Sequence, residues 1–117
     1  IQKNKKMYII YIGLYNPFVP KYFYKILQRD IIMFVKSNRK HKKYKVYYNN
    51  KWIHFGDKRY GQYKDQTPLQ LYSHLNHNDK KRRHNYLRRA KGIRNKSGNL
   101  TWRDKNSANY YSVKYLW

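Results

Sequence analysis

Apolar and polar residues alternate in two short runs near the middle of the chain, within the stretch 44–55. Such period-two alternation predicts β-strands with one buried face. Asn49-Asn50 lies between the runs, and asparagine tolerates the positive φ angles of a tight turn. The pattern therefore predicts an antiparallel β-hairpin. Its expected register places Val46 opposite Ile53, Tyr44 opposite Phe55, and Tyr47 beside Trp52 on the other side of the hairpin.

Two segments after the hairpin carry the signals of helix starts. The first, 69–75, follows Thr67-Pro68, which has the form of an N-cap residue followed by proline at the first helical position. The second, 79–91, begins at Asn78 or Asp79, either of which can cap a helix, and a glycine follows its last residue. We therefore expect a short helix and then a longer, strongly basic one.

The chain closes with a third helical segment, 106–117, in which Ser107 is an N-cap and apolar side chains recur at helical spacing. A terminal apolar helix is normally docked on a core. These elements predict a small α+β domain over 44–117, with a β-hairpin followed by two or three short helices packed on one hairpin face. The expected core residues are Val46, Ile53, Phe55, Leu71, Leu75, Tyr86, Leu87, Ala90, Val113, Leu116 and Trp117.

Residues 1–32 form a distinct first segment, expected to be an irregular N-terminal extension. Its apolar run, 7–15, is too short for a membrane-spanning helix, which needs about 20 mainly apolar residues. Two interpretations of the segment are open: translation starts at Met33, or residues 1–32 belong to the native protein. The following stretch, 33–43, includes the run KSNRKHKK, whose lack of apolar periodicity is typical of a mobile basic arm.

The charge balance of the sequence indicates that this small domain binds a polyanion. Lys and Arg number 28 against five Asp and no Glu, so the formal net charge is +23. Without residues 1–32 it is still +18, from 22 basic and four acidic side chains. Such self-repulsion opposes folding, and an anionic partner would relieve it. Nucleic acid is the expected partner, an anionic membrane surface is the competing one, and a merely solubilising surface is the third interpretation.

The basic helix is the strongest candidate for phosphate contacts. Lys80, His84, Arg88 and Lys91 recur at helical spacing, and like charges so placed weaken an isolated helix unless an anion lies along them. Arg82 and Arg89 share another side, so either cations surround the helix or one side pairs with Asp side chains elsewhere. The candidate nucleic-acid-binding residues are Lys42, Lys43, Lys80, Lys81, Arg82, Arg83, Arg88, Arg89 and Lys91.

Candidate catalytic chemistry is sparse. His74, His77 and His84, with neighbouring Asn and Asp side chains, would suit an HNH-type metal nuclease, which holds its ligands around one ion in a ββα frame. However, His74 and His77 straddle a predicted helix break. The chain has no Cys, and it offers neither a nucleophile–base pair nor a glycine-rich phosphate loop. We therefore predict a non-enzymatic protein with no catalytic residue, metal site, cofactor or small-molecule substrate.

Three stretches carry a family resemblance: KVYYNNKWIHFGDKRYGQY, YSHLNHNDKKRRHNYLRRAKGI and the closing NSANYYSVKYLW. In this order they resemble a family of short basic proteins found in large DNA viruses and some phages. The resemblance covers about residues 44–117 and leaves 1–32 unmatched. It implies a viral origin and a location in the virion or the host cell interior, and it transfers no catalytic residue.

Three hypotheses follow for the function. The first is a viral protein that binds nucleic acid, DNA in preference to RNA, by sequence-independent phosphate contacts in packaging or condensation. The second is a minor capsid or virion structural protein whose cations contact acidic neighbouring proteins. The HNH-like nuclease is the third.

Overall fold

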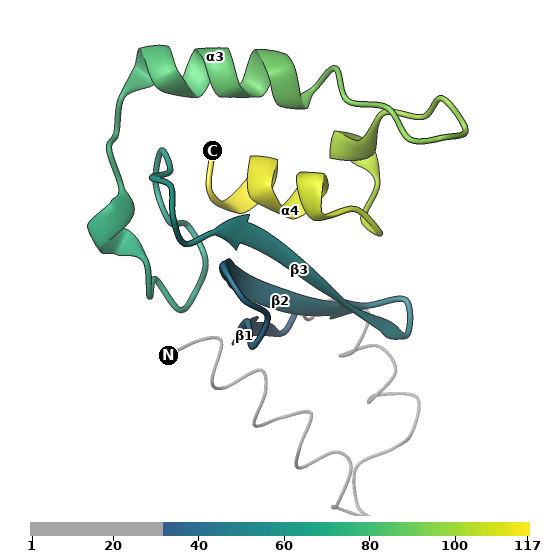
Figure 1. Cartoon of the computed structure of the whole chain (residues 1–117), viewed down its shortest axis with the longest axis horizontal. Coiled ribbons are helices and arrows are strands. Elements are labelled where there is room, and N and C mark those ends of the chain that lie inside the picture. Colours follow the sequence, from purple (N-terminus) through teal and green to yellow (C-terminus); the bar gives the residue numbers. More distant parts are fainter. Residues whose placement is uncertain (1–31) are drawn as a thin grey trace, which may run out of the picture.

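The computed structural model describes residues 32–117, which form a small α+β domain (Figure 1). The predicted fold class is therefore confirmed. The predicted N-terminal extension, with its apolar run and the two interpretations of Met33, lies outside the described residues except for Ile32. Within residues 32–117 no helix combines the length and apolar character needed to cross a membrane.

A three-stranded antiparallel sheet is the first half of the domain. Its strands are β1 (Phe34–Lys36), β2 (Lys42–Tyr48) and β3 (Lys51–Asp57), in the order β1-β2-β3. Strands β2 and β3 form the predicted hairpin with the predicted register: Val46 pairs with Ile53, Tyr44 with Phe55 and Tyr47 with Trp52. Asn49 and Asn50 both have positive φ angles, 52° and 63°, as a two-residue turn of this kind requires.

The prediction of a mobile basic arm over 33–43 is wrong. This stretch holds β1, a turn and the start of β2, and the Ser37 N–H donates to the Lys43 carbonyl at 3.0 Å. Phe34, one residue after Met33, is only 3% exposed and packs edge-on against Phe55 and Tyr115. The sequence pattern does not reveal this strand, because it is three residues long and its turn consists of polar and basic residues.

Two α-helices follow, and both begin where their capping residues predict. Asp79 accepts hydrogen bonds from the first backbone N–H groups of α3 (Lys80–Ala90), and Ser107 does the same for α4 (Ala108–Tyr115).

The short helix predicted over 69–75 does not form. Only a 3₁₀ turn, η1 (Ser73–Leu75), lies there, because Gln70 takes a left-handed φ of 49° that interrupts any helix. The Thr67 hydroxyl accepts from the Gln70 N–H, so it closes one turn and does not cap a helix. A second 3₁₀ turn, η2 (Thr101–Arg103), precedes α4.

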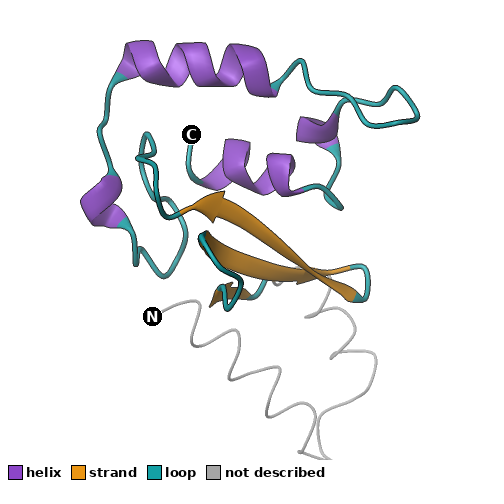
Figure 2. Cartoon of the chain, viewed as in Figure 1, coloured by secondary structure: helices purple, strands orange, loops and turns teal. Residues whose placement is uncertain are grey.

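The elements stack in three layers, with α4 between the sheet and α3 (Figure 2). Helix α4 places Tyr111 and Leu116, each 1% exposed, against the inner face of the sheet. The prediction that all the helices pack on the hairpin face is therefore wrong for α3, which packs on α4. The observed core is mainly aromatic: Phe34, Tyr44, Val46, Ile53, Phe55, Tyr72, Tyr111 and Leu116. Leu71, a predicted core residue, is 46% exposed because the expected helix is absent.

Candidate nucleic-acid interface

None of the four acidic side chains within residues 32–117 forms an ion pair with a cation of the basic helix. Asp57 pairs with Arg59 at 2.8 Å, the only ion pair within residues 32–117. Asp65 is buried among hydrogen-bond donors. The Asp79 carboxylate accepts from backbone N–H groups of the first turn of α3, and that of Asp104 accepts from the Asn106 N–H. Of the two alternatives raised by the sequence, pairing with Asp is therefore wrong, and cations extend around the helix.

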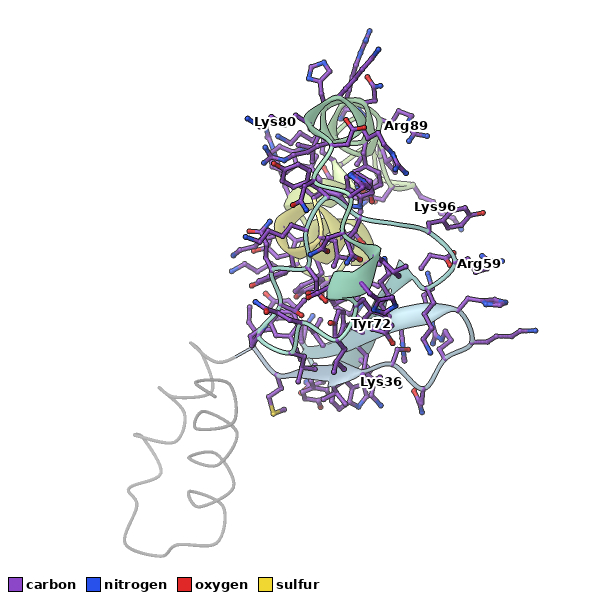
Figure 3. The ribbon with its side chains drawn as sticks, turned by 90° about the vertical axis from the view of Figure 1, so that its left-hand side faces the viewer. Lys36, Arg59, Tyr72, Lys80, Arg89 and Lys96 are labelled. Carbon is purple, nitrogen blue, oxygen red and sulfur yellow. The ribbon has the colours of Figure 1, made fainter. Side chains whose placement is uncertain are left out.

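Helix α3 presents most of its circumference to solvent. Only Tyr86, Leu87 and Ala90 of this helix are shielded from solvent, and of these only Ala90 is fully buried. Figure 3 looks nearly along the helix and shows side chains spreading from it, with Lys80 and Arg89 on opposite sides. We call the exposed cations of this helix and its C-cap the α3 basic surface; its members are Lys80, Lys81, Arg82, Arg88, Arg89 and Lys91.

Arg83 is the exception among the predicted binding residues of α3. Its Nε donates to the main-chain oxygen of Trp117 at 2.7 Å, and its guanidinium lies 4.9 Å from the centre of the Tyr63 ring. These contacts join α3 to the end of the chain and to the loop after β3. Arg83 therefore holds the helix in place and is less available to a ligand than its neighbours.

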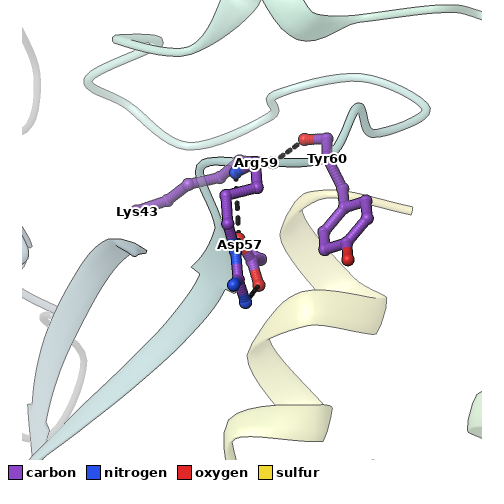
Figure 4. Close-up of polar contacts among 4 residues, drawn as sticks. All are labelled: Lys43, Asp57, Arg59 and Tyr60. Atoms are coloured by element: carbon purple, nitrogen blue, oxygen red, sulfur yellow. Dashed lines mark hydrogen bonds and ion pairs between the residues drawn. The ribbon is translucent and has the colours of Figure 1, made fainter. Parts of the chain in front are cut away.

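Lys43 does not belong to an exposed basic arm either. It lies in β2, is 1% exposed, and its Nζ donates to the Tyr60 carbonyl at 3.1 Å and to the Gln62 Oε1 at 2.5 Å. Figure 4 shows the side chain reaching the Tyr60 oxygen while Arg59 folds back onto Asp57. Lys42, on the same strand, is half-buried. The predicted role of both residues as a flexible arm is thus wrong.

Burial lowers the pKa of the Lys43 ammonium to about 8, while the more distant Asp65 and Asp57 carboxylates oppose this shift. Between about pH 8 and pH 10.5 the unfolded chain keeps a proton that folded Lys43 has lost. Stability from this residue should therefore rise with pH, by about 1.4 kcal/mol per unit at most. Urea unfolding of wild type and Lys43→Met at about pH 7.5, 8.5 and 9.5 measures this. The unfolding free energy of the wild type should rise relative to that of the variant as the pH rises. Parallel pH profiles of the two unfolding free energies would contradict the prediction.

A pocket of about 540 Å³ lies where α3, α4 and the end of β3 meet, and Lys43 is part of its lining. Arg82, Asn85 and Arg89 line it from one side of α3, since residues three and seven positions apart share a helix face. The sequence predicted that Arg82 and Arg89 share a side. It carried no signal that a lysine on a strand would join them.

The outer face of the hairpin carries a second exposed group. Tyr47 and Trp52, 43% and 42% exposed, pair across the strands with ring centres 5.2 Å apart, and the Lys45 ammonium lies 4.5 Å from the Trp52 ring. Exposed aromatic rings beside cations are the groups on which nucleic-acid bases stack. This face was predicted from the hairpin register, although its use was not.

The histidines do not assemble a metal site in the described part of the chain. Within residues 32–117 no three His or Asp side chains lie close enough together to hold an ion. His77 accepts the Asp79 N–H through Nδ1 and packs on the Trp117 ring, while His74 and His84 are exposed. These contacts give His77 a structural role at the start of α3.

The features above are a cationic helix without carboxylate partners, a pocket that it shares with a buried lysine, and an exposed aromatic pair. Comparison with protein-family models, with curated proteins and with solved structures finds no match to this chain. The function must therefore be argued from the geometry and charge of these surfaces.

Proposed function

We propose that this protein is a non-enzymatic nucleic-acid-binding protein that contacts phosphates, without reading sequence, through the α3 basic surface. The observation that carries the proposal is that no cation of this surface has a carboxylate partner within residues 32–117, where the single ion pair is Arg59–Asp57. A polyanion supplies the missing negative charge.

The geometry of α3 suits a nucleic-acid backbone. Its 11 residues span about 16 Å, and duplex DNA carries one negative charge per about 1.7 Å of its axis. Several phosphates can therefore lie along the helix at once. Long, flexible Lys and Arg side chains tolerate variation in phosphate position, so they suit contacts that position a protein without specifying bases. Binding would also relieve the like-charge repulsion that weakens the free helix.

A role in packaging or condensation follows from sequence-independent binding by so small and basic a chain. If residues 44–117 belong with the short basic proteins of large DNA viruses that they resemble, DNA is the partner and the virion or host cell interior is the location. Neutralising phosphates is the step that condensation requires, and no catalytic group takes part in it.

Salt dependence of binding tests the proposal. The full chain should bind a random-sequence DNA duplex at about 50 mM salt, with affinity falling steeply as salt rises. The variant Lys80→Gln, Lys81→Gln, Arg88→Gln, Lys91→Gln removes four cations of the α3 basic surface and keeps good helix formers. The slope of log affinity against log salt concentration should be about 3 to 4 less steep for this variant. Each phosphate that the protein no longer neutralises reduces the magnitude of the slope by about 0.9. Fluorescence anisotropy across a salt series gives both slopes.

A matched control loses the same charge elsewhere, through glutamine at the exposed loop residues Lys58, Lys64, Lys96 and Lys105. Its slope should change by less than about one, because few of these lysines reach a duplex lying along α3. Equal decreases in the two variants would mean that α3 is not the interface. Absence of DNA binding at about 50 mM salt would reject the proposal and favour a virion structural protein that contacts acidic neighbours.

A further inference from the structure

The pocket under α3 gathers cations from separate parts of the fold. Three of them line it: Lys43 from β2, and Arg82 and Arg89 from α3. The one carboxylate in the lining, Asp57, already receives two hydrogen bonds from the Arg59 guanidinium, at 3.0 and 2.8 Å. The pocket thus keeps most of its positive charge for something that enters it.

Lys43 makes this pocket different from the helix surface. Its ammonium has three N–H donors, and its two protein partners, the Tyr60 carbonyl and the Gln62 side chain, are both neutral. A buried cation without an anion in contact is costly, and an incoming anion would offset that cost. Lys43 is 1% exposed, so its charge acts on a group in the pocket from beneath the pocket wall, whereas the cations of the helix surface lie in solvent.

We propose that this pocket binds the phosphate monoester at the end of a nucleic-acid strand, an inference that rests on the proposed function. A terminal phosphate carries close to two negative charges, against one for each phosphodiester within the strand, and so matches a site with three cations better. It also projects from the end of the strand, whereas an internal phosphodiester is held between two sugars and lies across a surface. The α3 basic surface then contacts the phosphates that follow the end.

The remaining lining fits the nucleotide attached to such a phosphate. Tyr60 is 65% exposed at the pocket, and Tyr86 and Trp117 stack on each other with ring centres 3.9 Å apart. Aromatic rings of this kind contact a sugar or a base face. Asn85 and Ser112 add neutral hydrogen-bonding groups. The volume of about 540 Å³ accommodates a phosphate together with part of its nucleotide.

A pair of duplexes tests the inference. They share a sequence of about 12 base pairs and differ only in carrying 5′-phosphate or 5′-hydroxyl ends, so that ends are a large part of each ligand. The full chain should bind the phosphorylated duplex about tenfold more tightly, the effect of about one charge-assisted hydrogen bond. Equal affinity for the two duplexes would overturn the inference and leave the proposed function standing. Binding to neither would reject the proposed function itself.

Two adjacent arginines of α3 provide the matched variants. Arg89 lines the pocket and Arg88 does not, yet both are exposed and carry the same charge. In Arg89→Ala the ratio of the affinities for the phosphorylated and the 5′-hydroxyl duplex should fall close to one. Arg88→Ala should keep the wild-type ratio and weaken binding to both duplexes alike. Loss of the preference in both variants, with unchanged melting temperatures, would contradict a role for the pocket.

A free nucleotide offers the same phosphate monoester chemistry, and competition separates the two sources. Adenosine 5′-monophosphate should displace the phosphorylated duplex only at concentrations far above the Kd of that duplex, because it lacks the contacts to the α3 basic surface. Tighter binding of the mononucleotide than of the duplex would overturn the assignment to strand ends. Lys43→Met provides a further check, since it should abolish the preference through loss of the buried cation.

Discussion

Replacing Asp65 with alanine is expected to cost about 4 kcal/mol or more of folding stability, enough to unfold much of a domain of this size. Asp65 is 1% exposed and accepts four hydrogen bonds: two from Thr67, through its N–H and its hydroxyl, one from the Tyr72 N–H and one from the Tyr44 hydroxyl. Alanine would leave these buried donors without an acceptor, and each such loss costs about 1–3 kcal/mol.

Asp104→Ala is the control for this prediction, because it removes the same charge from a less buried site. Asp104 accepts from the backbone and side chain of Asn106, so its loss should cost about 1 kcal/mol. Tyr44→Phe provides a milder test. It removes one hydroxyl that donates to Asp65 and accepts from the Leu71 N–H, and should cost about 2 kcal/mol. Similar unfolding midpoints for Asp65→Ala and Asp104→Ala in urea would refute the importance of this network.

Replacing Gly56 with alanine is expected to cost about 2–4 kcal/mol and to disturb the pocket. Gly56 has a φ of +77°, which is unfavourable for any residue with a Cβ atom. An added Cβ would lie 2.9 Å from Lys43 Cδ and 3.0 Å from Leu116 Cδ1, closer than carbon atoms normally approach. The backbone strain and the clash add together, and relief of the clash requires Lys43 to move away from Tyr60 and Gln62.

Gly98 separates these two contributions. It has a similar φ of +83°, but a Cβ there would meet no heavy atom within 4 Å. Gly98→Ala should therefore show the backbone cost alone, about 1 kcal/mol. The difference between the two variants in denaturant unfolding measures the close packing of Lys43 and Leu116 around Gly56. A difference near zero would show that Lys43 is not held as tightly as its contacts indicate.

The parts of the fold that the sequence predicted depend on neighbouring residues. The hairpin follows from alternation around Asn49-Asn50. Helices α3 and α4 begin directly after Asp79 and Ser107, because a capping side chain acts on backbone groups two or three residues away. These signals lie within one short stretch, so they can be read without knowing what packs against it.

The parts that the sequence did not predict depend on residues far apart in the chain. Strand β1 is a strand because Phe34 packs on Phe55 and Tyr115, and the polar turn that follows gives no sign of it. The predicted helix over 69–75 is replaced by a loop whose backbone N–H groups bond to Asp65 and to the Tyr44 hydroxyl. Tertiary hydrogen bonds here outweigh a local helix signal.

The candidate interface likewise has a part that the sequence predicted and a part that it did not. The α3 basic surface was predictable, because helical periodicity alone places its cations. The pocket was not, because it exists only where the ends of β2 and β3 meet α3 and α4, and where a glycine at position 56 leaves room for Lys43. Arg83 could not be separated from its neighbours by sequence, since its contacts are with Tyr63 and Trp117.

The three tryptophans lie in three different places, and this gives each candidate surface its own intrinsic fluorophore. Trp52 is on the outer face of the hairpin, Trp102 lies 5.0 Å from the Lys91 ammonium at the end of α3, and Trp117 lines the pocket. A base or phosphate that approaches one of them alters the emission of that ring and not of the others. Variants with a single tryptophan would therefore report, without any attached dye, which surface a ligand occupies.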